Sequence, residues 1–86
     1  MARFQVLYWQ DVPSLVKVVG DDGAETKRQL PDWFQEEIDK RAMVQGLTDS
    51  DAYLEQWRWG DVEERTGSPD EVLDAIEREL VAAAGW

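Results

Sequence analysis

Apolar and polar residues alternate along three segments near the N-terminus: residues 3–9, 15–19 and 25–30. Side chains with a period of two point to opposite faces, and the β-branched and aromatic residues of the first two segments favour strands. In the first segment one face is expected to carry Phe4, Val6 and Tyr8 and the other Arg3, Gln5, Leu7 and Trp9. In the second segment one face is expected to carry Val16 and Val18 and the other Leu15, Lys17 and Val19. The third segment is nearly all polar, so we expect an edge strand, where charges discourage unwanted pairing.

Two breaks separate these segments. Pro13 has no backbone N–H and restricts the residue before it, so the run Asp11-Val12-Pro13 predicts an interruption, with the second strand beginning at Leu15. The run Asp21-Asp22-Gly23 predicts a tight turn, in which Gly23 supplies a positive φ.

A helical period follows in residues 31–45. Pro31 suits the first turn of a helix, and Gly46 suits the position just after its end. The expected buried stripe, one residue every four, is Phe34, Ile38 and Ala42. Thr48 and Asp51 then resemble a capped start, which predicts a short helical turn over residues 49–54.

Period two returns in residues 55–65. Trp57 and Trp59 share one face, Arg58 lies opposite, and Gly60 predicts a bulge that returns Val62 to the tryptophan side.

The clearest local signal is Ser68-Pro69-Asp70-Glu71, a capping box with proline at the first helical position. The following helix is expected to end at Gly85. Its buried residues are expected to be Val72, Leu73, Ile76, Leu80 and either Ala83 or Ala84.

This order, β-β-β-α-(short α)-β-α, predicts one α+β domain over residues 1–86. We expect a three- to four-stranded, mainly antiparallel sheet with two main helices packed on one face.

The charge is unevenly distributed. The formal net charge is −10, and residues 31–86 carry the whole excess, so the helical side is expected to be acidic and the sheet side near neutral. Such a charge repels phosphate backbones, which makes nucleic acid a poor partner. No apolar run approaches the roughly 18 residues that cross a bilayer, and no signal peptide is recognised, so we expect a cytoplasmic protein without membrane contact.

Histidine and cysteine are absent, which excludes a catalytic triad, a thiolate nucleophile and a Cys/His zinc site within this chain. The glycines do not cluster as in a phosphate loop, and Asp49-Ser50-Asp51 fails the calcium-loop pattern. We therefore expect no enzyme, no cofactor and no metal. Catalysis by paired carboxylates stays as a third hypothesis, with Glu36-Glu37, Glu63-Glu64 and Asp70-Glu71 as the candidates.

Two other functions rank ahead of this one. The first is a protein-interaction module, because tryptophan is abundant and is a typical interface anchor. Trp33 is expected at the edge of the core or exposed, and Trp86 ends the chain. An uncovered edge strand also leaves a homodimer open. The second is a binder of a small anionic ligand or single-stranded nucleic acid on the open sheet face, where four cations were expected together: Arg3, Lys17, Arg28 and Arg58.

Three short motifs resemble the small bacterial virulence factor domain family over most of residues 4–60. They are Tyr8-Trp9-Gln10-Asp11-Val12-Pro13, Phe34-Gln35-x-x-Ile38-Asp39-x-x-Ala42-Met43 and Asp51-Ala52-Tyr53-Leu54-x-x-Trp57. Family members usually have arginine where Gln10 stands.

The resemblance implies no reaction. It implies an accessory protein, in some members a companion of corrinoid- and folate-dependent methyl-transfer enzymes. The matched turn implies a binding surface at Trp9, Asp11 and Pro13, with Tyr53 and Trp57 beside it and Arg58 next to Trp57.

Overall fold

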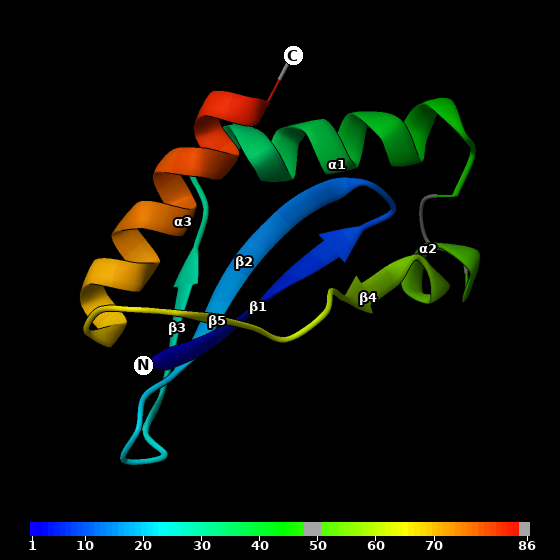
Figure 1. The fold of residues 1–86 in the computed structure, drawn as a ribbon. Helices are drawn as coiled ribbons and strands as arrows, with labels where there is room; N and C mark the ends of the chain where they lie inside the picture. Colours follow the sequence, from blue (N-terminus) through cyan, green and yellow to red (C-terminus); the bar gives the residue numbers. More distant parts are fainter. Residues whose placement is uncertain (48–50, 85–86) are drawn as a thin grey trace.

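The computed structural model describes residues 1–47 and 51–84. The strands are β1 (Ala2–Trp9), β2 (Val12–Val19), β3 (Glu25–Gln29), β4 (Trp57–Trp59) and β5 (Glu63–Arg65); the helices are α1 (Asp32–Val44), α2 (Asp51–Glu55) and α3 (Pro69–Ala83). The strands form one antiparallel sheet in the order β3-β2-β1-β4, and β5 also pairs with β1 (Figure 1). The predicted α+β class and antiparallel sheet are confirmed.

The hairpin of β1 and β2 is longer than predicted. β2 begins at Val12 rather than Leu15, and Pro13 lies inside it, opposite Tyr8. The register shifts between Leu7 and Tyr8, which leaves Ser14 as an extra residue on β2. A bulge tolerates proline within a sheet because a ladder hydrogen bond is already lost there, so Pro13 did not end the strand.

The predicted strand over residues 55–65 is divided into β4 and β5. Trp59 pairs with Leu7 and Glu63 pairs with Phe4, so three residues, 60–62, lie opposite two residues of β1. This one extra residue confirms the bulge expected at Gly60. The Gly60 N–H donates to the Val6 carbonyl at 2.8 Å, and a Cβ at Gly60 would stand 3.1 Å from the Tyr8 ring. Glycine therefore allows the close approach.

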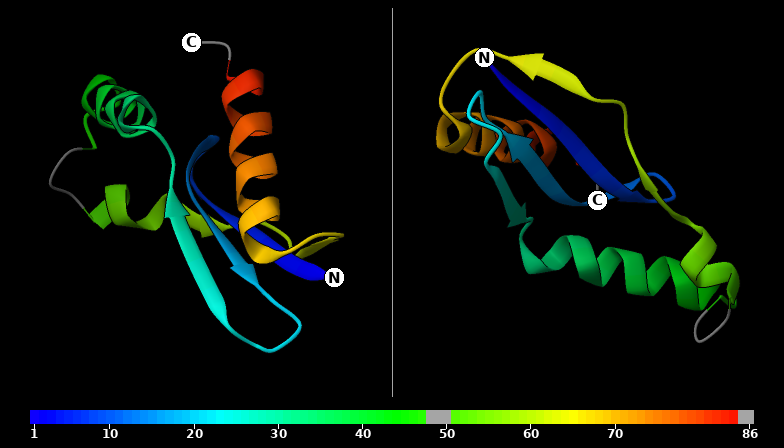
Figure 2. Two further views of the ribbon diagram at one scale, coloured as in Figure 1. Left: turned by 90° about the vertical axis from the view of Figure 1, so that its left-hand side faces the viewer. Right: turned by 90° about the horizontal axis from the view of Figure 1, so that it is seen from below.

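The core forms where the helices meet the sheet. Figures 1 and 2 show α3 along the central strands and α1 across the turn end of the β1–β2 hairpin. In Figure 1, α2 and β4 lie below α1, next to the same end of β1. The predicted helix stripes are buried as expected: Phe34, Ile38, Ala42, Val72, Leu73 and Ile76. Leu80 and Ala84 are half-buried against this core, whereas Ala83 is exposed.

The helix ends follow local chemistry. The Ser68 hydroxyl accepts from the Glu71 N–H at 3.3 Å, and Pro69 is the first residue of α3, as predicted. α1 begins at Asp32, so Pro31 is its N-cap rather than part of its first turn. Gly46 follows α1 with φ of 68°. The predicted cap at Thr48 and the stop at Gly85 lie outside the described residues.

Candidate interaction surfaces

Three of the predicted site residues form an aromatic cluster: Trp9, Tyr53 and Trp57. Trp9 is completely buried, and its indole N–H donates to the Tyr53 carbonyl at 3.0 Å. Its ring centroid lies 5.4 Å from that of Tyr53, whose ring meets Trp57 edge-on at 6.2 Å. Tyr53 and Trp57 are half-buried. The aromatic cluster therefore holds α2 against the sheet, and the Trp9 side chain is part of the core.

Gln10 links the hairpin turn to two other segments. It has a positive φ of 54°, and its backbone N–H donates to the Gln56 carbonyl at 3.1 Å. Its side-chain amide exchanges hydrogen bonds with that of Gln45, at 2.7 and 2.9 Å. An arginine has donors but no acceptor, so it cannot complete this reciprocal pair. The turn is thus fixed here by neutral amides.

Asp11, Pro13 and Arg58 gather around Tyr8 instead. The sheet register places Pro13 and Arg58 on either side of Tyr8. The Arg58 guanidinium lies 5.1 Å from the centre of the Tyr8 ring and 3.8 Å from the Asp11 carboxylate. Asp11 is almost fully exposed, whereas Pro13 is buried. Tyr8 was not among the predicted site residues, because only the two strand pairings make it central.

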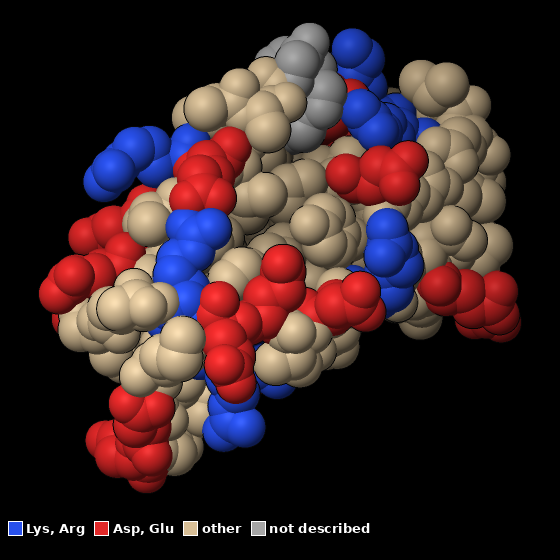
Figure 3. All heavy atoms as spheres, in the orientation of Figure 1, with Lys and Arg blue, Asp and Glu red and all other residues tan. Residues whose placement is uncertain are grey.

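Three hollows meet at Tyr8 and form what we call the Tyr8 groove, between α3 and the edge made by β4 and β5. Their volumes are about 170, 650 and 220 Å³. The apolar part of the lining comes from β1, β2, α1, α3 and the residue after α3: Phe4, Val6, Tyr8, Pro13, Phe34, Ile76, Leu80, Ala83 and Ala84. Figure 3 shows this face, with apolar and polar uncharged side chains in the centre and charged ones around them.

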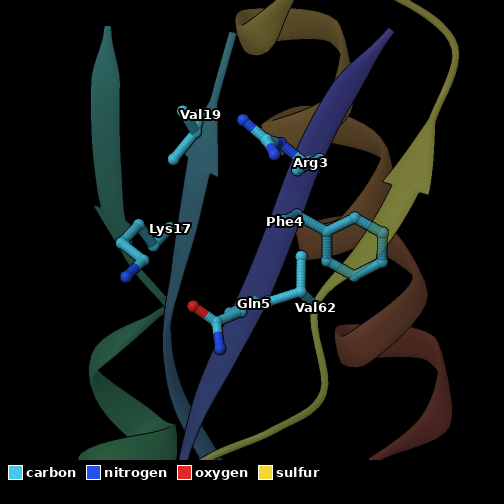
Figure 4. A pocket seen from close by; sticks show the side chains of 6 residues that line it. All are labelled: Arg3, Phe4, Gln5, Lys17, Val19 and Val62. Atoms are coloured by element: carbon cyan, nitrogen blue, oxygen red, sulfur yellow. The ribbon is translucent and has the colours of Figure 1, made fainter. Parts of the chain in front are cut away.

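A second surface, which we call the open face, lies on the side of the sheet away from α3. Figure 4 shows Arg3, Gln5, Lys17, Val19 and Val62 there, around a hollow of about 170 Å³. By register, Leu7, Leu15 and Trp59 continue the same face.

The open face keeps apolar groups in contact with solvent. Trp59 is 42% exposed and Val62 is 57% exposed. The Lys17 ammonium lies 4.6 Å from the centre of the Trp59 ring and 3.7 Å from the Glu25 carboxylate.

Two of the four cations expected on the open face lie elsewhere. Arg28 pairs with Asp74 and Glu77 of α3, and its hydrogen bond to Asp74 raises the pKa of its guanidinium. Arg58 lies over Tyr8 in the groove. Residues 27 and 28 point to opposite sides of the edge strand, and Lys27, not Arg28, pairs with Lys17 across the register. The predicted cluster of four cations is therefore wrong: Arg3 and Lys17 remain on the open face, and Lys27 joins them there by register.

Trp33 is both exposed and at the edge of the core: it is 36% exposed and stacks on Phe34, with ring centroids 4.3 Å apart. Trp86 lies outside the described residues.

The carboxylates that could perform acid/base chemistry lie at the surface. In the described parts of the chain no charged side chain is buried, and no cluster of Asp and Glu could hold a metal ion. Five of the six candidate carboxylates are exposed, and Glu37 accepts a hydrogen bond from Arg41 at 2.7 Å. Among residues 1–47 and 51–84, no helix is long and apolar enough to span a membrane.

The fold and these surfaces define a small acidic α+β domain with two hollowed surfaces, one on each side of β1, which share Phe4 and Val62 in their linings. The chain belongs to the virulence factor family, whose model matches residues 7–84. The match extends beyond the motifs recognised in the sequence and includes α3. Comparisons with curated proteins and with solved structures find no match.

Proposed function

We propose that this protein is a non-enzymatic accessory module that binds a protein partner through the open face. The observation that carries the proposal is the apolar character of an uncovered sheet face. Antiparallel sheets with one solvated face usually alternate apolar-in and polar-out. Here apolar side chains point outward from three strands and from the connection between β4 and β5: Leu7, Leu15, Val19, Trp59 and Val62.

The open face has the composition of an interface. Trp59 supplies an aromatic anchor, and Arg3 and Lys17 add charge beside the hollow. Aromatic residues and arginine are enriched where protein partners bind most strongly. Burying Trp59 and Val62 under a partner would also add apolar contact to a domain whose own core is small.

A protein partner fits this surface better than nucleic acid or a small anion. Of the three cations on this face, Arg3, Lys17 and Lys27, Lys17 already faces both Trp59 and Glu25, so the face of that indole is not free for stacking on a base. The net charge of −10 also opposes a phosphate backbone.

The non-enzymatic part of the proposal rests on the side chains available. The chain has neither histidine nor cysteine, five of the six candidate carboxylates are exposed, and no pair among them is buried as acid/base chemistry would require. A turnover measured with the purified protein, and abolished by replacing one acidic residue, would contradict it.

The partner that we propose is a methyl-transfer enzyme of the corrinoid- or folate-dependent kind, by family resemblance. We also propose a cytoplasmic location, because the proposed partner enzyme is expected in the cytoplasm.

The test compares two tryptophans of similar exposure on different surfaces. Tagged wild-type protein, Trp59→Ala and Trp33→Ala are incubated with native lysate, and the complexes are separated by size and identified by mass. We expect a stoichiometric complex with the wild type and with Trp33→Ala, and its loss with Trp59→Ala while the circular dichroism stays unchanged. Equal retention by both variants, or no stoichiometric complex with any, would contradict the proposal.

A further inference from the structure

The Tyr8 groove lies on the opposite side of β1 from the open face, because Tyr8 and its neighbours Leu7 and Trp9 alternate along the strand. We infer that the Tyr8 groove is a second docking surface, which takes a basic, partly apolar segment of a polypeptide. This inference does not depend on the proposed function of the open face.

The floor of the groove provides room for apolar anchors. Two of its hollows, with volumes of about 170 and 220 Å³, are separated by Tyr8 and Leu80, which line both. An apolar cavity of about 150 Å³ is large enough to bind benzene. The first hollow therefore suits one aliphatic or aromatic side chain, and Ala83 keeps its wall low, whereas the second is lined by Glu63, Arg65 and Glu79 as well as by apolar side chains.

The rim of the groove favours a cationic occupant. Its four acidic residues, Asp11, Asp61, Glu63 and Glu79, outnumber its two basic residues, Arg58 and Arg65. Both cations face carboxylates already: Arg65 pairs with Glu79, and Arg58 stands near Asp11. Asp61 and Glu63 are exposed and form no ion pair with another described residue.

The charge of the whole molecule acts in the same direction as the rim. A net charge of −10 steers cations toward the protein and slows the approach of anions. At the groove, the sign of the local charge thus agrees with the sign of the net charge of the protein. On the open face they do not, since Arg3 and Lys17 line a hollow in an acidic protein.

The shape of the groove favours a polypeptide over a small cation. The three hollows share Tyr8, and neighbouring pairs also share Asp11, Glu63 or Leu80. A single amine fills one hollow at most, whereas a chain with alternating side chains reaches the apolar floor and the acidic rim together.

The probe is a fluorescein-labelled heptapeptide, Lys-Leu-Lys-Phe-Lys-Leu-Lys, whose binding to the full chain is followed by fluorescence anisotropy. Two control peptides separate the contributions: one replaces Leu and Phe by Gly, and the other replaces every Lys by Glu. We expect the probe to bind at least tenfold more tightly than either control.

Matched variants locate the site. The pair Asp61→Asn and Glu63→Gln is expected to weaken binding about tenfold, and the control pair Glu36→Gln and Glu55→Gln, with the same change of charge at other exposed sites, less than twofold. Ala83→Gln, which obstructs a hollow, is expected to weaken binding about fivefold, and its exposed neighbour Ala82→Gln to leave it unchanged.

Amide chemical shifts of the ¹⁵N-labelled protein complete the test. Changes are expected near Tyr8, Asp11 and Leu80. The inference is overturned by equal losses in the two charge pairs, by a Gly-substituted peptide that binds as tightly as the probe, by tighter binding of the Glu peptide, by shifts centred on Lys17, or by no binding at all. Trp59→Ala, which tests the open face, is expected to leave probe binding unchanged, so the two proposals fail separately.

Discussion

Trp9 and Trp59 stand on neighbouring strands, yet one is completely buried and the other is 42% exposed. Trp9 pairs with Trp57 and Trp59 pairs with Leu7, so both lie along the same short ladder. α2 covers the first through Tyr53, whose carbonyl accepts from the Trp9 indole, while the Lys17 ammonium lies 4.6 Å from the ring centre of the second. The difference lies in what packs over each ring, which separates a structural tryptophan from one available to a partner.

The largest effect is expected from Trp9→Ala. Truncating a fully buried tryptophan costs about 3–5 kcal/mol of unfolding free energy, a large share of the total for a domain of this size. Urea denaturation followed by circular dichroism measures it. Trp33→Ala, at a partly exposed site on α1, serves as the control with an expected loss of about 1 kcal/mol. Similar losses in both variants would remove the distinction between buried and exposed tryptophans.

Trp59→Ala is expected to lower the unfolding free energy by about 1 kcal/mol or less, because much of the ring remains in water. The same denaturation experiment applies. A loss close to that of Trp9→Ala would make Trp59 a structural residue, and the open face would then lose its anchor.

Lys17→Met tests the contact above the Trp59 ring. The substitution keeps an apolar stem and removes the charge, so we expect a loss of about 0.5–1 kcal/mol from the cation–π contact. Lys27→Met is the matched control on the neighbouring strand, with an expected change close to zero. If both variants behave alike, the ammonium does not stabilise the indole.

The smallest effect is expected at the edge strand β5. An exposed ion pair, rather than buried apolar packing, connects this strand to α3. Arg65 on β5 donates to Glu79 on α3, with one of the bonds at 3.1 Å, and this hydrogen bonding lowers the pKa of the Glu79 carboxyl. A lowered folded-state pKa stabilises the protein above the ordinary value of about 4.3, and this contribution is lost as the pH falls through the folded-state pKa.

The thermal unfolding midpoint of Glu79→Gln is therefore expected to lie slightly below that of the wild type at pH 7. Near pH 3 the two midpoints are expected to be equal. Glu64→Gln, at an exposed carboxylate of the same strand, is expected to show no such convergence. A difference between wild type and Glu79→Gln that persists at pH 3 would show that the carboxylate charge is not involved.

Much of the local structure could be predicted from the sequence. The 3.6-residue stripe of Phe34, Ile38 and Ala42, the Ser68 cap and the bulge at Gly60 each depend on a few neighbouring residues, and each is confirmed. Pro13 was misjudged because the bulge that tolerates it requires the register of two strands.

The candidate site was harder to predict. Asp11, Pro13 and Arg58 do lie together, but around Tyr8, while Trp9 belongs to the core. Arg28 was placed on the wrong side, because a weakly alternating polar strand gives little sign of which face is buried.

The amino-acid order alone determined the positions of most strands and helices, the Ser68 cap, and the excess of acidic residues in the second part of the chain. These properties depend on contacts within a turn or two. Only the tertiary structure decided which tryptophan is covered, which arginines face α3 and which residues surround Tyr8. The surroundings of Tyr8 follow from pairing β1 with strands some fifty residues away, and the contacts of Arg28 follow from the packing of α3 on the sheet; neither can be obtained from local periodicity.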